Sequence, residues 1–248
     1  MRDTSWNKVG KWYDSIVGDE GSYYHQKIIL PNVVKLLALK KDSSLLDLGC
    51  GQGVLAGQVP KEVDYLGLDA AKSLLKMAKD RHKDKTFLYA DITKPLPIQS
   101  DRKFSHAAII LALQNMQDPE NVLKNVSNHL ISGATLVIIL NHPCFRIPRQ
   151  SSWAIDEKAK LQYRRVNSYM SEQKIPIVTS PGKSQSETTW SFHYPLSSYF
   201  SFLQNAGFVV QDLQEWCSDK ESLGKAARWE NRARKEFPLF MAIKAMHV

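Results

Sequence analysis

The sequence predicts an α/β protein with a doubly wound parallel sheet, and three features of the chain indicate it. First, from residue 44 onward, apolar runs typical of strands alternate with segments of helical periodicity, which favours parallel strands joined by right-handed crossovers. Second, the runs at 107–111 and 136–140 are apolar at every position, as in central strands buried on both faces. Third, three strand-like runs end in an aspartate. We therefore expect helices on both faces of one sheet and a ligand site at the carboxyl ends of its strands.

The expected elements follow in chain order. Two helices are expected before residue 43, because aromatic and apolar residues recur at helical spacing on both sides of a break at 18–22. Strands are then expected at 44–49, 63–69, 86–91, 104–113 and 133–141, with helices at 53–59, 71–82 and 118–130. A capped amphipathic helix after Pro195 should stop at Gly207 before another strand. Residues 238–245 should form the last strand.

Residues 143–192 interrupt this alternation. The segment is richer in proline, serine and basic residues, and we expect a helix from about Asp156 to Glu172 followed by a loop. Long insertions over the ligand side of a sheet tend to act as covers. We therefore expect one domain over residues 1–248, with a helical cover at 1–42 and an inserted substrate lid at 143–192.

Composition narrows the class of protein. The chain has 248 residues, of which 43% are hydrophobic, enough for one good core. Its apolar runs are far shorter than the roughly 20 residues that span a bilayer, and the first residues lack the apolar stretch of a secretory signal. We expect a cytoplasmic protein. The three cysteines are widely separated, so neither a disulfide framework nor a metal site is expected.

The net charge of +8 could serve an anionic partner. However, the basic residues are scattered rather than gathered in a long run. Nucleic acid is therefore possible as a partner but not favoured over a small-molecule substrate. The sequence gives no indication of oligomeric state.

The most informative motif is a turn after the first expected strand. Asp47 is followed by Gly49, Gly51 and Gly53 at alternate positions, a spacing too close for the G-x-G-x-x-G turn that cradles a pyrophosphate. Glycines let the backbone approach a ligand closely and adopt positive φ. The carboxylate of Asp47 at the strand end suits a cationic ligand. Either an ordinary strand-to-helix turn or a ligand site is compatible with this one motif.

The D-L-G-C-G-Q-G run at residues 47–53 resembles the first motif of class I S-adenosylmethionine-dependent methyltransferases. The later segments that end in Asp69 and Asp91 also fall where this family has acids. The resemblance implies a Rossmann-like seven-stranded sheet in the order 3-2-1-4-5-7-6 with an antiparallel seventh strand. It also implies S-adenosylmethionine as cofactor and S-adenosylhomocysteine as product.

The resemblance assigns roles to named residues. Asp69 would accept hydrogen bonds from both ribose hydroxyls, and Asp91 would accept from the adenine amino group while Ile92 packs on the ring. The residues expected to bind the cofactor are Tyr13, Asp47, Gly49, Cys50, Gly51, Gln52, Gly53, Asp69, Ala70, Asp91, Ile92 and Leu111.

Substrate chemistry is less clearly marked. His142, just after the fifth strand, is the leading candidate for a general base and His193 the second; either could instead be a structural histidine. Tyr24 and His25 in the N-terminal cover are candidate substrate residues. Arg146 and Arg149, with Arg164 and Arg165, could hold an acidic substrate or could be solvated surface residues.

The expected function is therefore methyl transfer to a small aromatic or lipid-like acceptor, as in the ubiquinone and menaquinone methyltransferase group, which the H-x-P-L-S run at 193–197 resembles. The segment 113–118 after the fourth strand lacks the N-P-P-Y motif of amine-methylating enzymes, which argues against methylation of adenine or glutamine amino groups. Two alternatives stay open. The positive charge would suit an RNA or protein methyltransferase, and the absence of an acid after Phe104 would suit a non-catalytic cofactor sensor.

Overall fold

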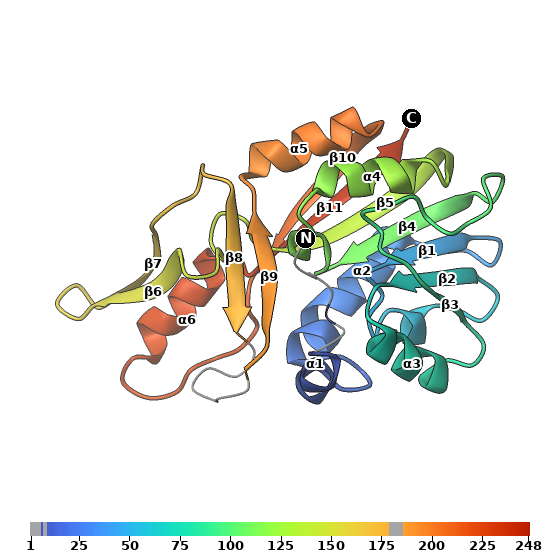
Figure 1. Ribbon diagram of the computed structural model, residues 1–248. Helices are drawn as coiled ribbons and strands as arrows, with labels where there is room; N and C mark the ends of the chain where they lie inside the picture. Colours follow the sequence, from blue (N-terminus) through green and yellow to red (C-terminus); the bar gives the residue numbers. More distant parts are fainter. Residues whose placement is uncertain (1–5, 7–8, 179–185) are drawn as a thin grey trace.

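A computed structural model describes residue 6 and residues 9–178 and 186–248. Its centre is a seven-stranded sheet in the order β10-β11-β5-β4-β1-β2-β3 (Figure 1). The strands are β1 (Ser44–Leu48), β2 (Asp64–Asp69), β3 (Thr86–Tyr89), β4 (Phe104–Ile110), β5 (Leu130–Asn141), β10 (Phe208–Trp216) and β11 (Phe240–His247). β11 runs antiparallel to both of its neighbours, β5 and β10. The predicted Rossmann-like fold and its strand order are confirmed.

Helices cover both faces of this sheet (Figure 1). One face carries α4 (Pro119–Ser127) and α5 (Leu196–Asn205). The other carries α2 (Leu30–Leu37), which continues from a π-helical turn at His25–Ile29, and α3 (Lys72–Arg81). The first helix, α1 (Gly10–Val17), packs against α3. Two hydrophobic clusters fill the spaces between the sheet and these two helical layers.

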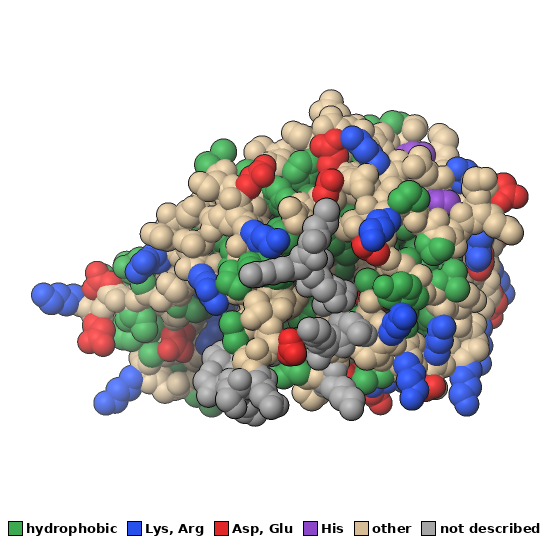
Figure 2. Space-filling model, viewed as in Figure 1, with side chains coloured by type: hydrophobic (Ala, Val, Ile, Leu, Met, Phe, Trp, Pro, Cys, Tyr) green, Lys and Arg blue, Asp and Glu red, His purple; other side chains and the backbone are tan. Residues whose placement is uncertain are grey.

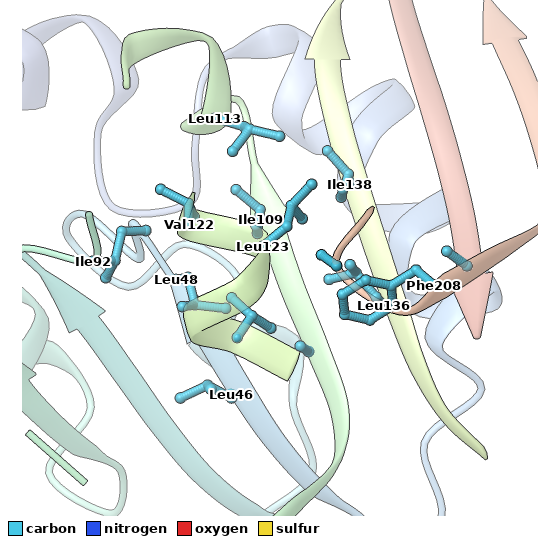
Figure 3. Packing of buried hydrophobic residues seen from close by; sticks show 14 of the residues in the cluster. Leu46, Leu48, Ile92, Ile109, Leu113, Val122, Leu123, Leu136, Ile138 and Phe208 are labelled. Carbon is cyan, nitrogen blue, oxygen red and sulfur yellow. The ribbon is translucent and has the colours of Figure 1, made fainter. Parts of the chain in front are cut away.

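The side chains of β1 alternate between the two hydrophobic clusters. Leu46 and Leu48 belong to the cluster under α4, together with Val122 of that helix (Figure 3). Leu45, on the opposite face, belongs to the cluster with α2. Because neighbouring side chains of a strand point to opposite faces, Asp47 lies on the side of Leu45. This places the first acid of the glycine motif on the face that α2 and α3 cover.

The helix predicted at 53–59 is wrong. Only a short 3-10 turn forms, at Ala56–Gln58. Gly53, the first residue of the predicted helix, has a φ of 84°, which a right-handed helix cannot accommodate. The turn that contains Gly49 and Gly51 therefore continues past Gly53, and the chain forms only the short turn at Ala56–Gln58 before β2.

The helix predicted at 156–172 is also wrong. Residues 143–192 instead contain a hairpin of β6 (Ser151–Asp156) and β7 (Leu161–Val166) and a second pair, β8 (Gln173–Val178) and β9 (Thr188–His193). Alternate large side chains in β6 and β7 favour strands. The tight turn between them is closed by Asp156, whose Oδ1 accepts from the backbone N–H of Ala159 at 2.8 Å.

Both strand pairs lie beyond the carboxyl ends of the central strands (Figure 1). They are next to α6 (Ala227–Glu236), a helix that the sequence did not predict. α6 packs against β7. The segment is thus an added β structure beyond the carboxyl ends of the central strands. Its role as a substrate lid stays a prediction.

Candidate functional site

The glycine turn is tied to the neighbouring strand. The backbone N–H groups of Gly49 and Cys50 donate to the carbonyl of Leu68 in β2 at 2.7 and 3.0 Å. A Cβ atom on Gly49 would lie 2.5 Å from Cβ of Ala112, whereas a Cβ on Gly51 would have only Leu74 Cδ1 within 4 Å, at 3.9 Å. Both positions need positive φ. The first glycine therefore permits close packing at the end of β4, and the second leaves the backbone open to a ligand.

A buried carboxylate, Asp47, and a half-buried one, Asp69, lie at this turn. Asp47 is 2% exposed and its Oδ2 accepts from the Tyr65 hydroxyl at 2.6 Å. Asp69, at the end of β2, accepts from the backbone N–H of Gly51 at 2.8 Å and of Ala71 at 2.7 Å. Among the described residues no lysine or arginine forms an ion pair with either acid. The site therefore presents negative groups without a protein cation.

Burial controls the pKa values of this pair. Burial raises the pKa of Asp47 to about 7, although the hydrogen bond from Tyr65 opposes the rise, and the charge of Asp69 adds to it. Burial also raises the pKa of Asp69, against the hydrogen bonds from the backbone. A positively charged ligand would offset the repulsion between the two carboxylates and stabilise their ionised forms. The pair of carboxylates thus fits a sulfonium or ammonium group.

The Asp47 carboxyl should make stability fall as pH rises. The folded protein holds a proton that the unfolded chain loses near its usual pKa of 3.8, so the free energy of unfolding should decrease between pH 4 and pH 7. The difference between 3.8 and about 7 corresponds to about 4 kcal/mol. We expect Asp47→Asn to stabilise the cofactor-free protein at pH 8 and to have little effect at pH 4. Urea denaturation at the two pH values measures this.

Asp42→Asn, at an exposed position just before β1, is the matched control and should not change the pH dependence. Asp69 contributes a change of the same sign in every variant, because its pKa is also raised. Equal stability of Asp47→Asn and the parent protein at pH 8 would contradict the prediction.

The other predicted cofactor residues lie around this turn. Burial raises the pKa of Tyr13 in α1 to about 12, and the charge of Asp69 adds to the rise. Leu111 follows β4 with a φ of 52°. Gln52 is buried and donates to the carbonyl of Gly18 at 3.3 Å. Cys50 is also buried, and Ala70 is half-buried between Asp69 and the start of α3.

The acid after β3 lies one strand further along the sheet. Asp91 Oδ1 accepts from both the N–H and the hydroxyl of Thr93, at 3.1 and 2.6 Å, and its side chain is 41% exposed. The neighbouring Ile92 is buried in the cluster under α4. The acid is therefore accessible at the ligand edge, while the isoleucine also serves the core.

The N-terminal cover is fastened to α3 by one arginine. Arg81 forms ion pairs with Asp14 of α1 at 2.9 Å and with Asp19 at 2.5 Å. These contacts hold α1 beside the glycine turn. The role of residues 1–42 as a cofactor cover stays a prediction, and residues 1–5, 7 and 8 of this range lie outside the described residues.

The two histidines proposed as bases are engaged with the protein. His142 is 1% exposed. Its Nδ1 accepts from the N–H of Cys144 at 3.2 Å, so that Nε2 carries the proton and donates to Glu215 at 2.6 Å. His193 is buried, and its Nε2 donates to the carbonyl of Tyr169 at 2.6 Å. Burial lowers the pKa of both imidazoles. Burial thus favours the neutral form of both rings, and each ring is held by hydrogen bonds within the protein.

The predicted substrate residues are only partly brought together. Tyr24 and Arg146 line a pocket of about 280 Å³. His25 is buried near Ser22 Oγ, 2.9 Å from its Nδ1, and burial lowers its pKa to about 4. Arg149 is exposed and does not line the pocket. The other lining residues are Phe145, Trp153, Arg164, Phe237, Pro238 and Leu239.

Most of these pocket residues were not predicted. Trp153 is brought beside Arg164 only by the register of the β6–β7 hairpin, where the sequence predicts a helix from about Asp156. Phe237 and Pro238 immediately precede the last strand, and nothing in the sequence alone connects them with residues 145–164. Arg165, unlike Arg164, is exposed and lies outside the lining.

Among the described residues, no group of three or more His, Cys, Asp or Glu side chains is arranged to hold a metal ion. Within the same residues, no helix is both long and apolar enough to cross a membrane.

Strand order, the glycine turn and the paired acids together define a class I S-adenosylmethionine-dependent methyltransferase fold. Residues 46–138 match the methyltransferase domain family. The match covers less than half of the chain and includes the glycine turn, Asp69 and Asp91. It indicates a methyltransferase domain there, with S-adenosylmethionine as the cofactor.

Individual proteins are similar to part or most of this chain. A demethylmenaquinone methyltransferase of Thermotoga maritima is 30% identical over 110 residues, which are 43% of this chain and 47% of that enzyme. The match thus spans about half of the relative's length. An uncharacterized protein of Haemophilus influenzae is 24% identical over 88% of this chain and 86% of its own. The crystal structure of an S-adenosylmethionine-dependent methyltransferase from Mesorhizobium loti has the same fold, with a TM-score of 0.68 and 23% identity over 88% of this chain and 96% of that one.

Proposed function

We propose that this protein transfers a methyl group from S-adenosylmethionine to a small aromatic or lipid-like acceptor. The observation that carries the proposal is the aromatic-lined pocket of about 280 Å³, close to the lower end of the range for small-molecule sites. It begins just after β5, at the same edge of the sheet as the glycine turn after β1. An acceptor there could face a cofactor held at that turn.

The residues of the turn would hold the cofactor. Asp47 would compensate its positive charge, and Asp69 would accept from the ribose. A carboxylate offers about four acceptor sites, and Asp69 accepts from the backbone N–H groups of Gly51 and Ala71, which leaves acceptor capacity for ribose hydroxyls. Asp91 and Ile92 are the proposed adenine contacts. When bound, S-adenosylmethionine supplies a methyl group already activated by the sulfonium.

The work left to the protein is mainly alignment and exclusion of water. Holding two reactants in line can contribute about 7 to 11 kcal/mol, so a strong base is not required of every acceptor. His142 remains the proposed base, because its ring lies 4.9 Å from that of Phe145, which lines the pocket. To accept a proton at Nδ1 it would have to release the Cys144 N–H. His193 is the second proposal.

A macromolecular acceptor is the alternative suggested by the net charge of +8. On the face shown in Figure 2, lysine and arginine side chains are dispersed and interspersed with acidic ones. A phosphate backbone favours clustered cations and gives binding that weakens steeply with salt. The pocket therefore supports a small acceptor more strongly than the charge supports RNA or protein.

The test is transfer of a labelled methyl group from S-adenosylmethionine into an extract of the host cell, followed by fractionation. We expect label in an organic-soluble or small aqueous fraction. Label in RNA or protein would replace the proposal with its alternative. Binding of S-adenosylhomocysteine by calorimetry without any transferred label would favour a cofactor sensor.

A further inference from the structure

We propose that Arg146 and Arg164 form a carboxylate-binding site, so that the methyl acceptor is an aromatic or other apolar acid anchored by its carboxylate. This inference rests on the proposed function, because it names the substrate class of the same pocket. The carboxylate is the anchor and not the group that receives the methyl. The site is called here the two-arginine pocket.

The register of the β6–β7 hairpin builds one side of this pocket. Trp153 pairs with Arg164 directly across the hairpin, and directly opposed residues place their side chains on the same face. The Arg164 guanidinium lies 5.2 Å from the centre of the Trp153 ring, a cation–π distance. Arg165, the next residue, must point to the opposite face and is exposed. The hairpin therefore directs one arginine of this pair into the pocket.

Hydrogen bonds hold the Arg164 side chain in place but do not use all the N–H groups of its guanidinium. Its Nε donates to the carbonyl of Phe145 at 2.6 Å and its Nη2 to Ser151 Oγ at 2.8 Å. A guanidinium has five N–H groups, so these bonds leave Nη1 and one N–H of Nη2 for a ligand. The two anchors make the guanidinium a preorganised donor.

Arg146 approaches from the other side of the pocket. Its guanidinium lies 5.2 Å from the centre of the Phe240 ring, and its Nη1 donates to the carbonyl of Leu239 at 3.4 Å. Burial lowers its pKa and the charge of Arg164 lowers it further. Two positive groups thus face one partly buried space.

No acid balances this pair of charges. Among the described residues, neither arginine has a carboxylate within ion-pair distance. Partly desolvated like charges are costly unless a counter-charge meets them, and a planar guanidinium fork matches a carboxylate. The unpaired arginines therefore favour an anionic ligand.

The remaining wall is aromatic. The ring of Phe237 lies 5.5 Å from that of Phe145 and 5.6 Å from that of Trp153, both at steep angles. Edge-to-face rings of this kind accept another ring or an apolar chain. A bare phosphate would leave this surface unused. The combination of cations and rings selects an acid that also carries an apolar body.

The test compares binding of 2-naphthoate with that of its neutral analogue 2-naphthalenemethanol, by ligand-observed NMR on the full chain saturated with S-adenosylhomocysteine. We expect the acid to bind at least tenfold more tightly than the alcohol. Arg146→Gln and Arg164→Gln should each weaken the acid about tenfold or more, since a charge-assisted hydrogen bond is lost, and should leave the alcohol almost unchanged.

Arg165→Gln is the matched control, because it removes the same charge from the same strand on the opposite face, and its affinity for the acid should stay that of the parent. Arg146→Lys keeps a charge but not the fork, and it should lose part of the acid's affinity even if Arg164→Gln proves unstable. Equal affinity for acid and alcohol, no effect of the Arg146 variants, or no binding of the acid at millimolar concentration would overturn the inference. Calorimetry with S-adenosylhomocysteine tests the proposed function separately, so loss of cofactor binding marks a failure there instead.

Discussion

Gly49→Ala is expected to lower the free energy of unfolding by about 2 to 5 kcal/mol and to abolish measurable binding of S-adenosylhomocysteine. Two costs add at this position. A φ of 70° disfavours any residue with a Cβ, and the new Cβ would lie 2.5 Å from that of Ala112, which forces β4 and the turn apart. Urea denaturation measures the first effect and calorimetric titration the second.

Variants of two other glycines distinguish the backbone cost from the packing cost. Gly133→Ala also requires positive φ but meets no atom within 4 Å, and its place in β5 is far from the turn in sequence, so it should show the backbone penalty alone with normal cofactor affinity. Gly51→Ala lacks a clash but lies in the turn proposed to hold the cofactor, so it should cost less stability than Gly49→Ala and still weaken binding. If Gly49→Ala were as stable as Gly133→Ala, the close packing against Ala112 would not be the cause.

Asp69→Asn is expected to weaken binding of S-adenosylhomocysteine about 100-fold. An amide loses the charge that would strengthen hydrogen bonds from two ribose hydroxyls, each worth about 1.5 to 3 kcal/mol. It also offers only one acceptor atom to the N–H groups of Gly51 and Ala71, which the two carboxylate oxygens share. Calorimetric titration measures the dissociation constant.

Asp64→Asn is the control, since Asp64 begins the same strand and its exposed carboxylate pairs only with Arg102 among the described residues. We expect parental affinity from it. A dissociation constant for Asp69→Asn within a factor of two of the parent would remove the ribose assignment.

The central sheet could be predicted because its signals are local. Runs such as 136–140, apolar at every position, define a strand buried on both faces without reference to any other part of the chain. The order of the strands came from the resemblance, which in turn depended on the short run 47–53. Both are features that a single stretch of sequence contains.

The failures arose where local and longer-range signals compete. Residues 156–172 have apolar positions at helical spacing, but a turn at 157–160 and pairing of Trp153 with Arg164 make a hairpin. At 53–59 the positive φ of Gly53 prevents a helix from beginning there. Tyr24 and Arg146 were singled out from the sequence and do line one pocket, yet the pocket itself could not be foreseen because its walls are distant along the chain.

The separation along the chain between the pocket residues and the glycine turn also affects how such a protein can evolve. Every residue that lines the two-arginine pocket lies outside residues 46–138, the part that matches the methyltransferase domain family, whereas the glycine turn, Asp69 and Asp91 lie within it. Under the proposed function, mutations in the hairpin or before β11 would alter the acceptor site without changing the residues proposed to bind the methyl donor. A family built on that plan would diversify its acceptors while it inherits one unchanged donor site.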